Sequence, residues 1–190
     1  MSKNKEYAEK YAVFAMEQMR KYGIPASVTL AQGILESSNG QSRLSLNENN
    51  HFGIKATPGW IAQGGKYGIY TDDKPNEKFC SYDNVGDSYE HHSKFLVENK
   101  RYAECFDLSP DDYKGWTEGL AKAGYASGGN YAQSLQKIIE ANGLQKYEGK
   151  RIGNRNRTSG YDKRLFIPGR ARRVPVCHFT VWNAYRPHGC

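Results

Sequence analysis

The stretch YGIPASVTLAQGILESSNGQSRLSLNENNHFGIK, residues 22–55, decides the fold. Pro25 suits the first turn of a helix, where its missing N–H costs nothing, and Ser27 could instead cap a slightly later start. Apolar residues then recur on one helical face: Val28, Ala31, Ile34 and Leu35. Glu36 closes this run, and the polar, glycine-ended segment at 37–40 predicts the helix end. The sequence therefore predicts a helix of about three turns with a carboxylate in its last turn.

A carboxylate in this position has two physical reasons to keep its proton. The C-terminal end of the helix dipole disfavours an anion, and burial against an apolar face disfavours it further. Both effects would raise the pKa of Glu36, as a general acid for glycoside cleavage requires. Judged by position alone, a solvated glutamate at a helix end is the commoner arrangement.

Four segments of the chain resemble the N-acetylglucosaminidases of glycoside hydrolase family 73, which cleave bacterial peptidoglycan. The family's hallmark is a helix reading A-Q-x-x-x-E-S-x-x-G, followed by S-x-L and then N-N-x-F-G-I-K. The matching segments here are AQGILESSNG at 31–40, SRL at 42–44 and NNHFGIK at 49–55. The segment GYASGGNYA at 124–132 resembles the family's G-Y-A-T-D-P-x-Y-A, with two glycines replacing the acid and the proline. The resemblance runs from about residue 7 to residue 143.

This resemblance implies an α+β, lysozyme-like fold that is mostly helical with a small β-hairpin lobe. Glycines and short aromatic pieces, including Trp60-Ile61, predict two or three short strands within 54–82, and residues 37–50 read as a polar loop. Helical spacing and capping residues predict four further helices: at 4–22, at 85–99 after Asn84 or Asp83, from Ser109-Pro110, and from about Asn130 to Asn142.

The resemblance also implies a set of catalytic residues around Glu36, the candidate general acid. It places a second acid in the β-lobe, where the segment TDD makes Asp73 the best match, Asp72 a near equal and Glu77 a third candidate. A substrate-assisted route needs no second carboxylate, because the 2-acetamido group of the sugar can attack the anomeric carbon. In that route Tyr125 could orient the acetamido group. The alternatives are a solvated acidic turn and a tyrosine hydrogen-bonded at a helix end.

Further residues are implied as contacts to the glycan: Gln32, Asn50, Phe52, Trp60 and Tyr131. For the aromatic members, packing in the core is the ordinary alternative, and for Asn50 it is structural capping.

The positive charge is concentrated at the C-terminal end. The whole chain carries a net charge of +7, yet residues 151–190 hold nine of the 27 Lys and Arg and one of the 20 acids, so this segment is +8 and the rest is −1. We expect residues 1–146 to form the catalytic domain and 147–190 to form a basic, Arg/Gly/Pro-rich tail that is disordered, loosely packed or a non-native read-through. By charge alone, such a tail could hold anionic wall polymer, lipid headgroups or nucleic acid, although a solvated tail without a specific partner is commoner.

Composition excludes several other classes. No apolar run approaches the ~18 residues of a membrane span, and the N-terminus lacks the pattern of a signal peptide, so reaching a cell wall would need phage release or a trimmed leader. The four cysteines have no CxxC spacing, and His51, His91 and His92 lack ligand spacing, so we expect neither metal nor cofactor. A Cys80–Cys105 disulfide is conceivable, but free thiols are expected.

We therefore predict a peptidoglycan hydrolase that cleaves the β-1,4 bond after N-acetylglucosamine. Its partner would be the glycan strand, its location the extracellular or periplasmic cell wall, and its state a monomer. A lysozyme-type muramidase or a lytic transglycosylase is the alternative among enzymes. A non-catalytic wall-binding or virion structural module is the alternative from another class. Specific nucleic-acid binding is not expected, because the aromatic residues of the tail lack a single-strand-binding pattern.

Overall fold

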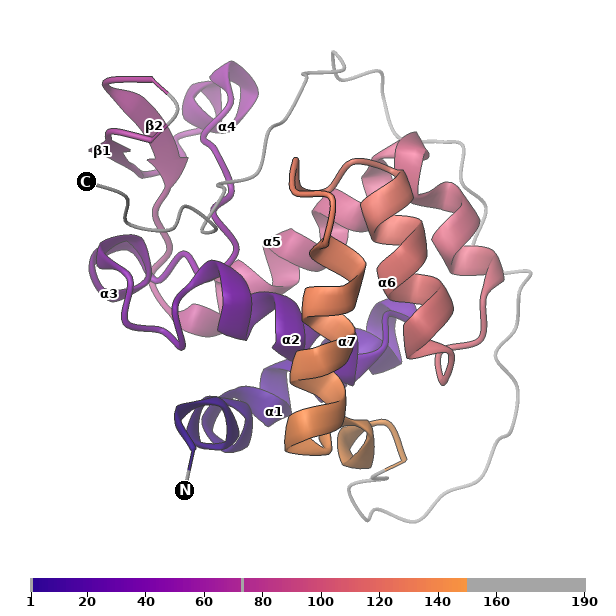
Figure 1. Cartoon of the computed structure of the whole chain (residues 1–190). Helices are drawn as coiled ribbons and strands as arrows, with labels where there is room; N and C mark the ends of the chain where they lie inside the picture. Colours follow the sequence, from indigo (N-terminus) through magenta and orange to yellow (C-terminus); the bar gives the residue numbers. More distant parts are fainter. Residues whose placement is uncertain (1, 73, 150–190) are drawn as a thin grey trace, which may run out of the picture.

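The computed structural model describes residues 2–72 and 74–149, and the chain forms a mostly helical body with a small antiparallel hairpin at one side (Figure 1). The predicted α+β class, mostly helical with a β-hairpin lobe, is confirmed. The α-helices are α1 (Lys3–Tyr22), α2 (Ala26–Glu36), α3 (Arg43–Glu48), α4 (Pro58–Ala62), α5 (Val85–Glu98), α6 (Tyr113–Lys122) and α7 (Tyr131–Asn142). Two 3₁₀ helices, η1 (Lys100–Asp107) and η2 (Leu144–Tyr147), and two strands, β1 (Tyr67–Tyr70) and β2 (Glu77–Cys80), complete the described elements.

Helix α2 is the centre of the body. Ten of its eleven residues are buried, and it packs against α1, α7 and η2 (Figure 1). Burial reaches beyond the predicted apolar face, because the polar side chains of Ser27, Thr29 and Gln32 are buried as well. The helix ends at Glu36 as predicted, because Ser38, Asn39 and Gly40 take left-handed backbone conformations with φ of 50°, 60° and 74°.

The start of α2 is stabilised from a distant part of the chain. Pro25 occupies the N-cap position and offers no side-chain hydrogen bond. The hydroxyl of Ser27 instead donates to the carboxylate of Glu148, which follows η2. Glu148 thus places a negative group at the positive end of the helix dipole. Tyr147 is buried and Glu148 bonds to Ser27, so both pack on the body. The domain boundary at 146 stays a prediction, and residues 150–190 lie outside the described part of the chain.

Two segments predicted as irregular or extended are helical. The polar loop predicted at 37–50 contains α3, which begins because Ser42 caps it through a 3.1 Å bond from Ser45 N–H to Ser42 Oγ. The Trp60-Ile61 piece lies in α4 rather than in a strand, since Thr57 caps that helix with Pro58 at its first position.

The helix predicted to start at Ser109-Pro110 starts later. Asp112 accepts a 2.9 Å bond from Gly115 N–H, so α6 begins at Tyr113. The short 3₁₀ helix η1 was not predicted. Helices α1, α5 and α7 agree with the predicted spans to within a residue or two, including the Asn84 cap of α5 and the left-handed Gly143 that ends α7.

The β-lobe is a hairpin in which Tyr67 pairs with Cys80 and Tyr70 with Glu77. An isolated bridge between Lys55 and Phe79 adds a short third piece, so the predicted two or three strands are confirmed. The lobe joins the body through apolar residues such as Cys80 and Tyr82, which are part of the common core, and through polar contacts at its neck. Asn50 is the most connected of these: its amide donates to the carbonyls of Ile54 (3.0 Å) and Cys80 (2.9 Å), and its Oδ1 accepts from Ile54 N–H (3.1 Å).

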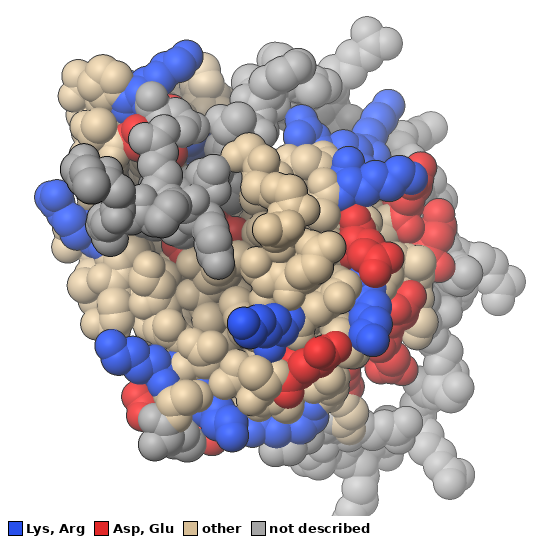
Figure 2. Space-filling model, in the orientation of Figure 1, with Lys and Arg blue, Asp and Glu red and all other residues tan. Residues whose placement is uncertain are grey.

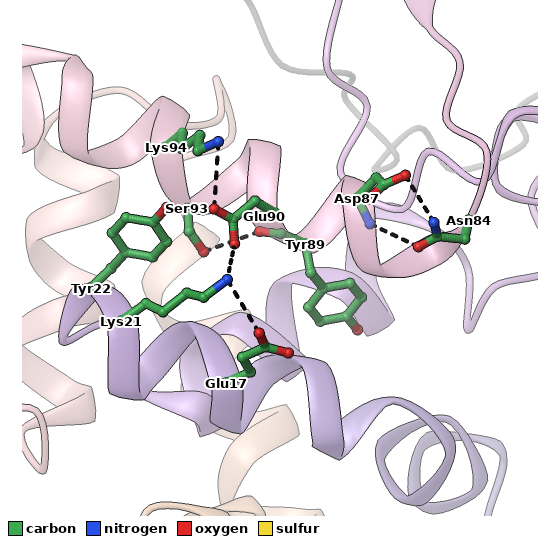
Figure 3. Close-up of polar contacts among 9 residues, drawn as sticks. All are labelled: Glu17, Lys21, Tyr22, Asn84, Asp87, Tyr89, Glu90, Ser93 and Lys94. Atoms are coloured by element: carbon green, nitrogen blue, oxygen red, sulfur yellow. Dashed lines mark hydrogen bonds and ion pairs between the residues drawn. The ribbon is translucent and has the colours of Figure 1, made fainter.

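The described surface is mixed in charge. On the face drawn in Figure 2, basic and acidic side chains are interspersed over the described residues, as expected for a body close to neutrality. Figure 3 shows one such group, where Glu90 of α5 lies against Lys21 and Tyr22 of α1 and against Lys94. Cys80 and Cys105 are buried free thiols, as expected. Among the described helices, none is long and apolar enough to cross a membrane.

Candidate active site

Glu36 lies at the last turn of α2 with 3% of its surface exposed. The hydroxyl of Tyr131 donates to its Oε1 at 3.1 Å, and the amide of Gln32 donates to the Tyr131 hydroxyl at 3.0 Å. Gln32 and Glu36 are four residues apart, so they share one face of α2, and Tyr131 is the first residue of α7, which packs on that face. The three side chains therefore form one buried chain of hydrogen bonds that orients the carboxyl group.

Burial sets the protonation state of this carboxyl group. It raises the pKa of Glu36 to about 8, while the hydrogen bond from Tyr131 lowers the pKa by a smaller amount. At neutral pH the group is therefore mostly protonated and can donate a proton. The expectation from sequence, a raised pKa at the end of an apolar helix, agrees with this geometry.

Tyr125 lies against the same cluster. Its ring stacks on that of Tyr131, with centroids 5.6 Å apart and planes 16° apart, and it meets His92 edge-on at 5.9 Å. The side chain is buried, and its hydroxyl makes no hydrogen bond to any described residue. Burial, with the charge of Glu36 as a second cause, raises the pKa of Tyr125 well above its usual value. The structure thus brings together four predicted site residues: Glu36, Gln32, Tyr125 and Tyr131.

Two predicted glycan contacts lie in the core rather than at a surface. Phe52 is fully buried and stacks on His92 at 4.0 Å, while Asn50 is 1% exposed and uses its amide to hold the neck of the lobe. Gln32 and Tyr131 are also buried, at 0% and 6% exposure. Gln32 and Tyr131 thus support the acid through their hydrogen bonds, while Phe52 and Asn50 pack elsewhere in the interior.

The remaining predicted residues belong to the lobe. Trp60 is half-buried, stacks on His91 at 4.9 Å and donates its indole N–H to the carbonyl of Lys66. It lines a hollow of about 550 Å³ between the lobe and α5, and Glu36 is not among the lining residues. Trp60 thus lies at this hollow, where its ring also meets that of Tyr82 at 5.8 Å.

Acidic residues of the lobe surround a lysine. Lys55 Nζ lies 2.7 Å from Glu77 Oε1 and 3.7 Å from Asp72 Oδ2. Both acids thus contact the same cation of the lobe. Asp73, the other predicted second acid, lies outside the described residues.

Sequence reasoning missed how the acid is held. Gln32 and Tyr131 were predicted as sugar contacts, yet they form the hydrogen-bond chain to Glu36. A signal was present for Gln32, because a polar residue four positions before the acid shares its helix face. Tyr131 could be placed only once the packing of α7 on α2 was known. No described residues form a cluster of three or more potential metal ligands.

A buried, protonated glutamate at the end of a central helix, beside a small β-lobe, defines a lysozyme-like glycoside hydrolase domain. The catalytic domain of the autolysin Auto from Listeria monocytogenes has this fold, with a TM-score of 0.66 and 27% identity, covering 77% of this chain and 88% of that one. Residues 12–144 match the Glucosaminidase family model, described as mannosyl-glycoprotein endo-beta-N-acetylglucosaminidase. The chain belongs to this family, glycoside hydrolase family 73.

Curated relatives are of the same family. The peptidoglycan hydrolase FlgJ of Vibrio cholerae is 32% identical over 148 residues, which cover 73% of this chain and 41% of that protein. The exo-glucosaminidase LytG of Bacillus subtilis is 30% identical over 140 residues, 67% of this chain and 48% of that protein. The chain thus spans less than half the length of either relative.

Proposed function

We propose that this domain hydrolyses the β-1,4 bond after N-acetylglucosamine in peptidoglycan, with Glu36 as the general acid. One observation carries the proposal: a buried carboxyl group whose pKa is raised to about 8 and whose orientation is fixed by Tyr131 and Gln32. Membership of the glucosaminidase family and the names of the relatives supply the substrate class.

The first chemical step is proton transfer from Glu36 to the leaving oxygen. Tyr131 already donates to Oε1, so Oε2 is the atom that would carry the proton. When the proton leaves, the Tyr131 hydroxyl stabilises the carboxylate that forms, and it does so more strongly than it binds the neutral acid. The hydrogen bond is thus worth more after proton transfer than before it.

The positive charge that develops at the anomeric carbon has two candidate partners. Asp72 or Asp73 could act as the second carboxylate, and Asp72 lies 3.7 Å from Lys55 Nζ. Alternatively, the 2-acetamido oxygen attacks the anomeric carbon. The Tyr125 hydroxyl would then orient the acetamido group, and its lack of a partner among the described residues supports this role.

Digestion of purified peptidoglycan, followed by borohydride reduction and sugar analysis, tests the proposal. We expect reduced glucosaminitol from the wild type and none from Glu36→Gln, which removes the proton but keeps the shape. Reduced muramitol would indicate a muramidase, and anhydromuramic acid a transglycosylase. No product from either protein, when thermal unfolding shows both to be folded, would favour the wall-binding module.

The same activity implies where the protein acts. We infer that it acts on the cell wall, with the glycan strand as its partner, and that it works as a monomer. Sedimentation of the purified chain with and without soluble glycan tests whether the protein is a monomer.

A further inference from the structure

A second hollow, of about 720 Å³, lies between α1, α3 and the turn that follows Glu36. On α1 its lining residues are three or four positions apart, so one face of the helix follows the hollow for about 16 Å. These residues are Lys3, Glu6, Tyr7, Lys10, Tyr11 and Phe14. The lining does not include Glu36, Tyr125 or Tyr131, so we distinguish this hollow, the α1 groove, from the candidate active site.

The wall opposite α1 offers amides and one exposed apolar side chain. Asn39, Gln41 and Asn49 supply the amides, and Leu46 of α3 is 61% exposed. Asn39 and Asn49 hold left-handed backbone conformations, with φ of 60° and 52°. Residues other than glycine adopt this conformation rarely, and where they do, the position is often a functional site. Asn39 Oδ1 is shielded from solvent and has no hydrogen-bond partner among the described residues.

The floor of the α1 groove rests on the catalytic helix. The Tyr7 hydroxyl contacts His51 Nδ1 at 2.7 Å and the Tyr89 hydroxyl at 2.9 Å, all in the buried interior. A side chain at Gly33 of α2 would collide with the same Tyr7 hydroxyl. Burial lowers the pKa of His51 to about 4, so the floor is uncharged at neutral pH. The groove therefore has a rigid, neutral floor directly behind the turn after Glu36.

The rim of the groove selects the ligand by charge. Lys3 and Lys10 outweigh Glu6, and Lys10 Nζ lies 5.1 Å from the centre of the Tyr11 ring. Aromatic rings pack on the apolar faces of sugars, amides bond to hydroxyl and acetamido groups, and lysines pair with carboxylates. An apolar partner helix would leave these amides and lysines without partners, which is costly.

We propose that the α1 groove binds a second stretch of peptidoglycan, an amino-sugar chain with its acidic peptides. The inference rests on the proposed function, because it takes the substrate polymer as the ligand. A stretch held in this groove would keep the domain on the polymer while Glu36 works on another bond.

Sedimentation with insoluble peptidoglycan tests the proposal, with the full chain in a Glu36→Gln background so that the polymer stays intact. We expect Lys10→Glu with Leu46→Asp to weaken binding about tenfold, from the loss of one charged and one apolar contact. The matched control, Lys5→Glu with Val13→Asp, makes the same chemical changes at exposed α1 positions outside the lining. It should bind as the parent does.

Equal sedimentation of the two double variants, with equal thermal unfolding midpoints, would overturn the proposal. Hydrolysis by the wild type is scored separately by sugar analysis. A failure of the proposed function therefore appears as missing products, and a failure of the groove as equal binding.

Discussion

The helical body and the β-lobe hold their acidic groups in opposite ways. In the body, ten of the eleven residues of α2 are buried and Glu36 is 3% exposed. In the lobe, Tyr67 and Ile69 of β1 are 39% and 59% exposed, and Asp72 contacts a lysine. One region raises the pKa of a carboxyl group by burial, and the other pairs its carboxylates with a nearby cation. Within one small domain, carboxyl groups thus occupy an apolar interior in one region and an ion-pair cluster in the other.

The two regions also differ in what fixes them. The body is held by an apolar core in which Trp116, Leu120, Leu135 and Ile139 are fully buried. The lobe has little core of its own: its neck joins the body's core through Cys80 and Tyr82, and the hydrogen bonds of Asn50 fix it there. A buried core resists local opening, whereas a small and partly exposed hairpin opens at a lower free energy. The acid therefore sits on the stable part of the molecule.

The largest expected effect tests the burial of Glu36. In the unfolded chain this group ionises near pH 4.5, as an ordinary glutamate does, while in the folded protein it keeps its proton up to about pH 8. The proton on Glu36 therefore stabilises the folded state, and this stabilisation is fully present below pH 4.5. It is lost as the pH rises through 8, at about 1.4 kcal/mol per pH unit. Glu36→Gln removes this loss. From pH 4.5 to 8 its unfolding free energy should therefore rise relative to the wild type by about 4 kcal/mol, measured by urea denaturation.

The matched control for this experiment is Glu9→Gln, which changes an exposed glutamate of α1. Its stability curve should run parallel to that of the wild type. If the Glu36→Gln curve also ran parallel, Glu36 would be ionised and hydrated in the folded protein, and the contrast between body and lobe would fail.

A smaller effect is expected at the neck of the lobe. Asn50→Ala removes three hydrogen bonds and takes the acceptor from the buried Ile54 N–H and a donor from the Cys80 carbonyl, which should cost about 2–3 kcal/mol of unfolding free energy. Amide hydrogen exchange should quicken more in β2 than in α2. The exposed amide of Gln63, in the same lobe, gives the control Gln63→Ala. Equal acceleration in β2 and α2 would show that the lobe does not open separately.

Next in size is the hydrogen bond that orients the acid. Tyr131→Phe should lower kcat about tenfold, or about 1.4 kcal/mol, because the carboxylate formed after proton transfer loses its donor. Since that bond lowers the pKa of Glu36, its removal raises the pKa. The fall in activity as the pH rises through about 8 should therefore move to higher pH in the pH–rate profile.

Tyr22→Phe is the matched control, because it also removes a tyrosine–glutamate hydrogen bond, the 2.6 Å contact with Glu90 between α1 and α5. Its pH–rate profile should match that of the wild type. A shift of the Tyr131→Phe profile to lower pH would mean that Tyr131 favours the protonated acid instead.

Sequence predicted the body better than the lobe, for a physical reason. Helix α2, its end at Glu36 and the apolar faces of α5 and α7 follow from periodicity and capping, which are local. Helices α3 and α4 are short and depend on caps at Ser42 and Thr57 that are hard to tell from turn residues. Which residues surround Glu36 depends on contacts across 95 positions of sequence, such as that with Tyr131, which no local pattern contains.

The smallest effects are expected at two groups of surface ion pairs, one in each region. In the body, burial raises the pKa of Glu90, but hydrogen bonds from Tyr22 and Lys21 outweigh it and lower the pKa to about 2 (Figure 3). Its stabilisation is present above pH 4.5 and is lost as the pH falls through 2, so Glu90→Gln should cost about 1 kcal/mol at pH 7. In the lobe, Lys66 and Asp83 pair at 2.7 Å but are 70% and 76% exposed, so Lys66→Gln should leave stability unchanged. Urea denaturation at pH 7 and near pH 2 measures the unfolding free energy of both variants. An equal loss in both variants at pH 7 would mean that burial does not set the strength of these ion pairs.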